Sequence, residues 1–83
     1  MTQNKLEGRV AIITGAAGGL GGETAMVLAG HGASVALVDI NLEGASAIAD
    51  KINQAGGNAI AIQCDISLEQ QVREMVNSVV ALS

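Results

Sequence analysis

The chain contains three short apolar runs, and each is followed by a stretch whose apolar residues recur at helical spacing. The runs span residues 9–14, 34–39 and 59–64, and Val, Ile, Leu and Ala fill most of their positions. Apolar strands that alternate with amphipathic helices are typical of parallel sheets built from βαβ units. The sequence therefore predicts an α/β chain with three parallel strands, each followed by a helix.

Each predicted helix has a local start or stop signal. Glycine commonly closes a helix, so the first helix is predicted to end at 31–32 and the second at 56–57. Asn41 is the predicted N-cap of the second helix. The third helix is predicted to begin at Ser67, with Gln70 completing a capping box. The residues that recur at helical spacing, all apolar except Thr24, are Leu20, Thr24, Val27 and Leu28 in the first predicted helix, Leu42, Ala45, Ile48, Ala49 and Ile52 in the second, and Leu68, Val72, Met75, Val76, Val79 and Val80 in the third.

The chain has 83 residues, which is enough for one domain at most, because domains typically contain ~100–150 residues. In a sheet of strand order 3-2-1, the two crossover helices cover one face and the third helix covers the other. The first strand would then be an unpaired apolar edge, which natural proteins avoid. We therefore expect residues 1–83 to be the N-terminal part of a longer chain, or to self-associate through this edge as a homo-oligomer.

The composition excludes several classes of function. A net charge of -4 and the absence of aromatic residues argue against nucleic-acid binding, which uses basic patches and stacking rings. The apolar runs are only a few residues long, whereas ~20 are needed to span a bilayer, so no membrane partner is expected. The single cysteine, Cys64, cannot form an internal disulfide, so we expect a reducing, cytoplasmic location.

The most informative segment is the glycine-rich turn T-G-A-A-G-G-L-G at residues 14–21, between the first strand and the first helix. Glycine allows a positive φ and a close approach to the main chain. A helix N-terminus that follows directly offers free N–H groups and a positive dipole end, which together can bind a pyrophosphate. No Lys or Arg lies between Arg9 and Lys51, so any phosphate held here would be held by the backbone.

The spacing of this turn excludes two related motifs. The phosphate loop of P-loop NTPases needs a Gly-Lys-Ser/Thr end, which is missing. The G-x-G-x-x-G fingerprint would start at Gly19 and Gly21, but its last position falls on Thr24. The turn instead has the form T-G-x-x-x-G-x-G.

Two carboxylates complete the pattern. Asp39 ends the second predicted strand, 20 residues after Gly19, where an acid can accept hydrogen bonds from the adenosine ribose hydroxyls. The same carboxylate would repel a 2′-phosphate, so NAD is expected as the cofactor in preference to NADP. Asp65 follows the third strand, where it could accept a bond from the adenine amino group or simply start a turn.

In order and spacing, the glycine turn, Asp39 and the Asp-Ile pair at 65–66 resemble the short-chain dehydrogenase/reductase family. The resemblance runs from Gly8 to the third predicted helix. It implies a Rossmann-type three-layer α/β fold, of which residues 1–83 are an incomplete βαβαβα half within a single NAD(P)-binding domain. The cofactor-binding residues expected on this basis are Gly15, Ala17, Gly18, Gly19, Leu20, Gly21, Asp39, Ile40, Asp65 and Ile66, and no metal ligand is expected.

The resemblance implies that Gly15, Gly19 and Gly21 surround the pyrophosphate, that Asp39 binds the ribose, and that residues 65–66 lie at the adenine. Members of the family transfer hydride between NAD(H) and an alcohol or ketone, using a Ser, a Tyr and a Lys in a Y-x-x-x-K arrangement. This chain has no Tyr and no such lysine, so we expect no catalysis from it alone. The alternative is a free-standing adenine-dinucleotide-binding module without catalysis that pairs through its first strand.

Overall fold

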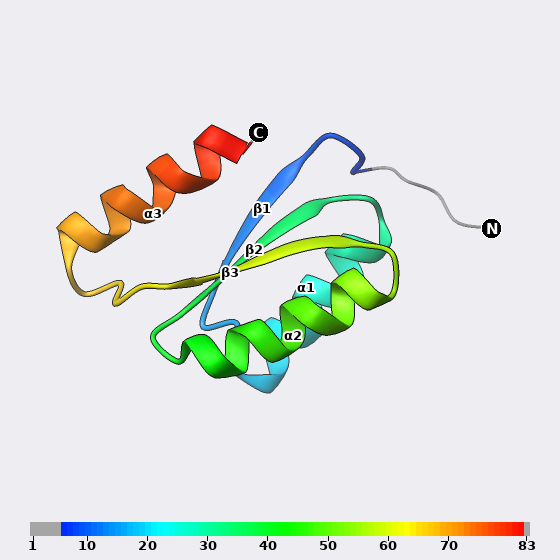
Figure 1. The fold of residues 1–83 in the computed structure, drawn as a ribbon, viewed down its shortest axis with the longest axis horizontal. Helices are drawn as coiled ribbons and strands as arrows, with labels where there is room; N and C mark the ends of the chain where they lie inside the picture. The colour runs from blue at the N-terminus through cyan, green and yellow to red at the C-terminus, as the bar shows by residue number, and fades with distance from the viewer. Residues whose placement is uncertain (1–5, 83) are drawn as a thin grey trace.

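The computed structural model describes residues 6–82, with the side chain of residue 82 excepted, and contains three strands that alternate with three helices (Figure 1). All strands are parallel, in the order β1-β2-β3, and residues 10, 34 and 58 are in register. The predicted βαβαβα architecture is therefore confirmed, and the strand order is 3-2-1. The elements are β1 (Val10–Thr14), α1 (Gly19–Gly30), β2 (Ser34–Asp39), α2 (Leu42–Gln54), β3 (Asn58–Gln63) and α3 (Glu69–Leu82).

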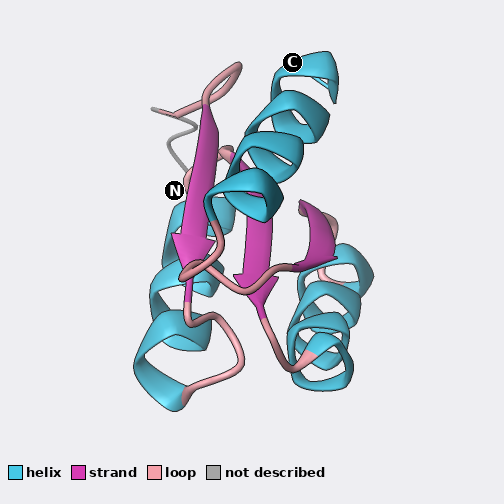
Figure 2. Ribbon diagram, turned by 90° about the vertical axis from the view of Figure 1, so that its left-hand side faces the viewer, coloured by secondary structure: helices cyan, strands magenta, loops and turns pink. Residues whose placement is uncertain are grey.

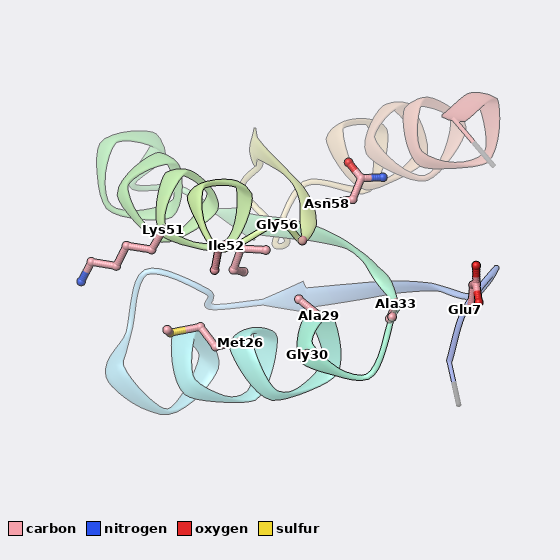
Figure 3. Close-up of a pocket in the computed structure, with 12 residues that line it drawn as sticks. Glu7, Met26, Ala29, Gly30, Ala33, Lys51, Ile52, Gly56 and Asn58 are labelled. Carbon is pink, nitrogen blue, oxygen red and sulfur yellow. The ribbon is translucent and has the colours of Figure 1, made fainter. Parts of the chain in front are cut away.

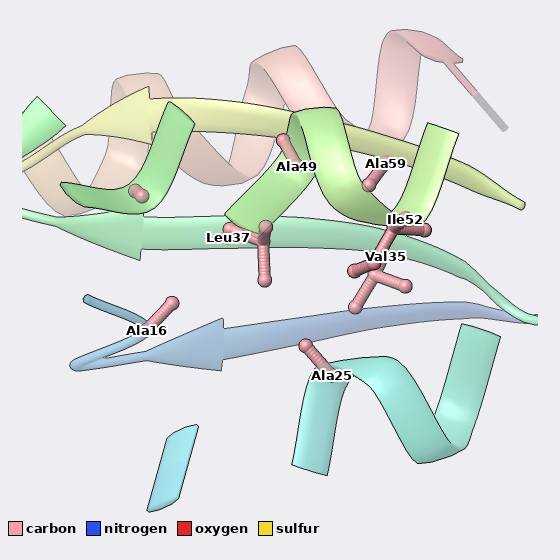
Figure 4. Close-up of a cluster of buried hydrophobic side chains, with 8 residues drawn as sticks. Ala16, Ala25, Val35, Leu37, Ala49, Ile52 and Ala59 are labelled. Carbon is pink, nitrogen blue, oxygen red and sulfur yellow. The ribbon is translucent and has the colours of Figure 1, made fainter. Parts of the chain in front are cut away.

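The elements form three layers, with α1 and α2 on one face of the sheet and α3 on the other (Figures 1 and 2). The central strand β2 supplies both apolar cores, because its successive side chains point to opposite faces. Val35 and Leu37 face α1 and α2 (Figure 4). The buried residues packed with them are Ala16, Ala25, Ala45, Ala49, Ile52 and Ala59.

The second core lies between the sheet and α3. Ala36 and Val38 of β2 pack there with Met75 and Val79 of α3. Cys64 is buried in the same cluster as a free thiol. Its position is that of a small buried hydrophobe, which is the common role of a buried cysteine.

Helix α1 packs on the sheet through its smallest residues. Gly22 and Ala25 are buried, whereas Leu20 and Val27 are 80% and 60% exposed. A Cβ added to Gly22 would lie 2.8 Å from Cδ1 of Ile48 in α2, so the two helices approach closely at this point. The predicted helix is confirmed, but the predicted apolar stripe is not its buried face, because Leu20, Thr24 and Val27 are exposed.

The boundaries differ from the predicted ones at four places. β1 begins at residue 10 rather than 9, and β3 spans residues 58–63 rather than 59–64. The predicted capping box of α3 is wrong, because the helix begins at Glu69 and Ser67 lies in the preceding turn. There the hydroxyl and the N–H of Ser67 both donate to Oδ1 of Asp65, at 2.7 and 3.0 Å, which holds Ser67 in the turn before the helix.

Two other predicted helix signals are confirmed. Oδ1 of Asn41 accepts a hydrogen bond from the Gly44 N–H at 3.1 Å, which caps α2. The helix ends at Gln54, and Gly56 follows with a φ of +91°, a conformation that favours glycine.

Strand β1 lies at one edge of the sheet, paired with β2 alone among the described residues. Val10 and Ile12 are in register with Ser34 and Ala36, so they lie on the α3 face, where they are 39% and 41% exposed. This edge is the apolar one expected for strand order 3-2-1. What pairs with it, a further segment or a second copy, stays a prediction.

Candidate functional site

The carboxyl edge of the sheet gathers the three segments that the sequence singles out. Parallel strands end at the same edge of a sheet, and ligands of open α/β folds bind beyond that edge. The glycine turn leaves β1 there, Asp39 is the last residue of β2, and Asp65 comes two residues after the end of β3. The Cys64 N–H donates to the Asp39 carbonyl at 3.2 Å, which joins the ends of β2 and β3.

The glycine turn doubles back sharply and packs against itself. Gly15 has a φ of +66°, which favours glycine, and its carbonyl accepts a bond from the Gly18 N–H at 3.1 Å. The N–H of the buried Ala16 donates to the Val38 carbonyl at 3.2 Å. A Cβ added to Gly21 would lie 2.6 Å from the Gly15 carbonyl oxygen, so the start of α1 has room for glycine alone at this position.

The N-terminus of α1 presents unpaired main-chain donors. Gly18 is the N-cap residue and supplies no side-chain cap. The N–H of Gly22 makes a bond to the Gly18 carbonyl at 3.0 Å, four residues back. The amides of Gly19, Leu20 and Gly21 precede it in the first turn, where an α-helix offers no partner for an N–H. Three donors at the positive end of a helix dipole can hold an anion.

Asp39 connects the second strand to the glycine turn. Its Oδ2 accepts a hydrogen bond from the Ala17 N–H at 3.0 Å, and its Oδ1 accepts one from the Asn41 N–H at 2.9 Å. The bond from Asn41, followed by the one from Ala17, lowers the pKa of the Asp39 carboxyl below its ordinary value. The carboxylate is half-buried and ionised at neutral pH. From the sequence, Asn41 is predicted only as a helix cap. Its N–H also donates to Asp39 two residues earlier, a local contact that Asp side chains commonly make in turns.

Asp65 is held by the turn that follows it. The Ser67 hydroxyl and then the Ser67 N–H, at 2.7 and 3.0 Å from Oδ1, lower the pKa of the Asp65 carboxyl. Its own N–H donates to Oε1 of Gln71 at 2.8 Å. Asp65 and Ile40 line one hollow of about 610 Å³ beside α3. Ile66, the residue after Asp65, is exposed.

The lowered pKa values of Asp39 and Asp65 predict that the folded chain loses stability in acid. Each pKa is lowered in the folded chain, so the stabilisation by each ionised group is complete above the ordinary value of 3.8. It decreases as the pH falls below that value and is lost once the pH passes the lower folded-state pKa. Urea unfolding between about pH 6 and pH 3 should show the midpoint falling, and falling less in Asp39→Asn. If the urea midpoint of Asp39→Asn fell as steeply with pH as that of wild type, Asp39 would not be a source of the acid sensitivity.

A second hollow, of about 450 Å³, lies between the C-terminal ends of α1 and α2 (Figure 3). Ala29 and Ile52 line its wall, Gly56 and Asn58 lie at one end, and Lys51 extends at its rim (Figure 3). It is at the end of the sheet opposite the glycine turn, because its lining includes the start of β3. No motif in the sequence points to this hollow.

Other kinds of site are not found in the part of the chain that the structure describes. Over residues 6–82, no three His, Cys, Asp or Glu side chains are placed to hold a metal ion. Every helix in the same range is too short or too polar to cross a bilayer.

A parallel sheet with a glycine turn and an acidic strand end at its carboxyl edge defines a Rossmann-type α/β protein. The family model of the short chain dehydrogenases matches residues 9–82. The chain therefore belongs to the short-chain dehydrogenase family, as the resemblance of its motifs predicts.

Curated relatives agree with this assignment. A 7alpha-hydroxysteroid dehydrogenase of Escherichia coli is 45% identical over 73 residues, which are 88% of this chain and 29% of the relative. A cyclohexanol dehydrogenase of an Acinetobacter species is 40% identical over 78 residues, 94% of this chain and 31% of the relative. The chain thus spans about three-tenths of the length of these relatives.

Solved structures show the same fold. A hydroxysteroid dehydrogenase from Escherichia coli superposes with a TM-score of 0.90 and 42% identity, covering 94% of this chain and 33% of the other. A 7alpha-hydroxysteroid dehydrogenase complexed with NADH and 7-oxo glycochenodeoxycholic acid gives a TM-score of 0.90 and 41% identity, covering 96% and 31%. These similarities confirm the predicted fold class.

Proposed function

We propose that this chain is the NAD-binding part of a short-chain dehydrogenase that transfers hydride between NAD(H) and an alcohol or ketone. One observation carries the proposal. The Asp39 carboxylate, which stands where a ribose acceptor is expected, accepts a hydrogen bond at 3.0 Å from the Ala17 N–H, and the glycine turn that contains Ala17 leads into the three free amides at the start of α1. Acceptors for a ribose and donors for a pyrophosphate thus adjoin each other. An adenine dinucleotide needs both groups in this order.

The residues present fit such a cofactor. The amides of Gly19, Leu20 and Gly21 would hold the pyrophosphate, and the absence of a Cβ at Gly21 keeps the turn tight against Gly15. Asp39 would hold the adenosine ribose. The hollow lined by residues 40 and 65 would receive the adenine, with Ile66 at its side. When bound, the nicotinamide supplies the hydride chemistry, and these residues supply affinity and orientation.

The charge of the site favours NAD over NADP. Asp39 is ionised at neutral pH and would face the 2′-phosphate of NADP, and no Lys or Arg lies between residues 9 and 51 to offset the repulsion. Calorimetric titration of the complete natural protein should therefore show NAD binding at least about tenfold more tightly than NADP. Equal or tighter binding of NADP would contradict the preference, and binding of neither would contradict the proposed function.

The proposal assigns cofactor binding, and no catalysis, to residues 1–83. The chain lacks the Tyr of the proton-transfer set that its resemblance implies, so that set would come from other residues of a longer natural chain. We expect no NADH production when residues 1–83 alone are given NAD and an alcohol. The expectation of a cytoplasmic location rests on the single cysteine of the sequence.

A further inference from the structure

The glycine turn is fixed to the second βα unit at two places. The first is the bond from the Ala16 N–H to the Val38 carbonyl, which depends on the main chain alone. The second is the bond from the Ala17 N–H to Oδ2 of Asp39, which depends on a side chain 22 residues further along the chain. Ala17 lies two residues before Gly19, whose amide is the first of the three free donors. The position of those donors therefore depends in part on the Asp39 side chain.

The Asp39 carboxylate is itself held in place. Its Oδ1 accepts the Asn41 N–H at 2.9 Å, and Asn41 caps α2 through the Gly44 N–H. A carboxylate offers about four lone-pair sites, of which these two bonds use two. The remaining sites can accept ribose hydroxyls while the Ala17 bond persists. Binding of a ribose therefore does not require release of the turn.

From this geometry we infer that Asp39 is a positioning residue for the pyrophosphate-binding turn, acting through the Ala17 N–H, in addition to being the ribose acceptor. The inference rests on the proposed function. A carboxylate that only received the ribose would matter only to ligands that carry ribose hydroxyls. A carboxylate that also positions the turn matters to any diphosphate bound there.

The binding experiment uses a ligand without ribose hydroxyls. In the complete natural protein, 2′,3′-dideoxyadenosine 5′-diphosphate is titrated against wild type, Asp39→Ala and Asp39→Asn. We expect Asp39→Ala to bind it at least about fivefold more weakly than wild type. Asp50→Asn, at an exposed carboxylate of α2, is the control for lost charge and should bind it as wild type does. Unchanged binding in Asp39→Ala would overturn the inference.

A second measurement needs no ligand. Amide hydrogen exchange at Ala17 should accelerate in Asp39→Ala, because its acceptor is removed, and should be unchanged in Asp50→Asn. Asp39→Asn keeps one acceptor oxygen, so its exchange rate should lie between those of wild type and Asp39→Ala. Core amides such as that of Leu37 should keep their protection, which separates a local change from unfolding. Unaltered exchange at Ala17 in both Asp39 variants would overturn the inference.

The two measurements distinguish failure of the inference from failure of the proposed function. If wild type does not bind NAD, the proposed function fails, and the exchange rates still decide whether Asp39 positions the turn. If wild type binds NAD, but Asp39→Ala weakens NAD alone and spares the dideoxy ligand and the exchange rates, only the inference fails.

Discussion

Replacing Gly21 with alanine is expected to weaken NAD binding at least about tenfold, which corresponds to about 1.4 kcal/mol. The new Cβ would lie 2.6 Å from the Gly15 carbonyl oxygen and 3.1 Å from Cα of Ala16. Both neighbours are main-chain atoms of the turn, so α1 and the turn must separate to admit the methyl group. That separation displaces the donors that would meet the pyrophosphate. Calorimetric titration of the complete protein measures the effect.

Gly30→Ala is the matched control for this substitution. Gly30 also lies in α1, at its last residue, and a Cβ there meets nothing within 4 Å. Alanine is the better helix former at either position, so helix propensity alone would stabilise both variants. We expect NAD affinity to be unchanged in Gly30→Ala and reduced in Gly21→Ala. An equal affinity in the two variants would refute the steric explanation.

Leu37→Ala is expected to destabilise the fold by roughly 2–5 kcal/mol. Leu37 is fully buried on the central strand and packs among the residues of the first core (Figure 4). Most of its neighbours there are alanines, whose short side chains cannot move in to fill the space that the leucine leaves. Urea unfolding followed by circular dichroism measures the change, since the chain has no Trp or Tyr to report by fluorescence.

Val27→Ala provides the contrast for this prediction. Val27 is an apolar residue of similar type, but it is 60% exposed on α1. Surface substitutions away from special features usually change stability by less than about 0.5 kcal/mol. A loss in Val27→Ala as large as that in Leu37→Ala would show that the exposed face of α1 is covered in the protein.

The order and kind of the elements could be predicted from the sequence because the signals are local. Continuous apolar runs mark the strands, and the Asn41 cap and Gly56 mark the ends of α2. The buried face of α1 could not be predicted in this way. Gly22 and Ala25 are the buried residues of α1, and a Cβ at Gly22 would already lie 2.8 Å from Ile48 of α2. A pattern of large apolar residues does not point to such small ones.

The start of α3 also differs from the sequence prediction, for a different reason. The spacing of Ser67 and Gln70 satisfies a capping box, but the Ser67 hydroxyl bonds instead to Asp65, and Gln71 accepts the Asp65 N–H. Asp65 and the start of the helix are alternative local partners for Ser67, and the spacing of the residues does not show which arrangement is more stable.

The parts of the candidate site could be predicted, but their connections could not. The glycine turn and Asp39 each stand at the end of a strand, and parallel strands bring such ends to one edge. The bond from Ala17 to Asp39 joins residues 22 positions apart, and their contact depends on strand register and on the path of the turn. The same holds for the hollow between α1 and α2, which forms only when the two helices pack on one face of the sheet.

The most direct test of the account is a titration of the ¹⁵N-labelled protein with NAD, followed residue by residue through its amide NMR signals. We predict that the largest shifts occur at the amides of Gly19, Leu20 and Gly21, with further shifts at Ile40 and Ile66. Shifts concentrated instead around the hollow at the opposite end of the sheet, at residues 29–30 and 56–57, would contradict the assignment of the glycine turn and Asp39 as the dinucleotide site.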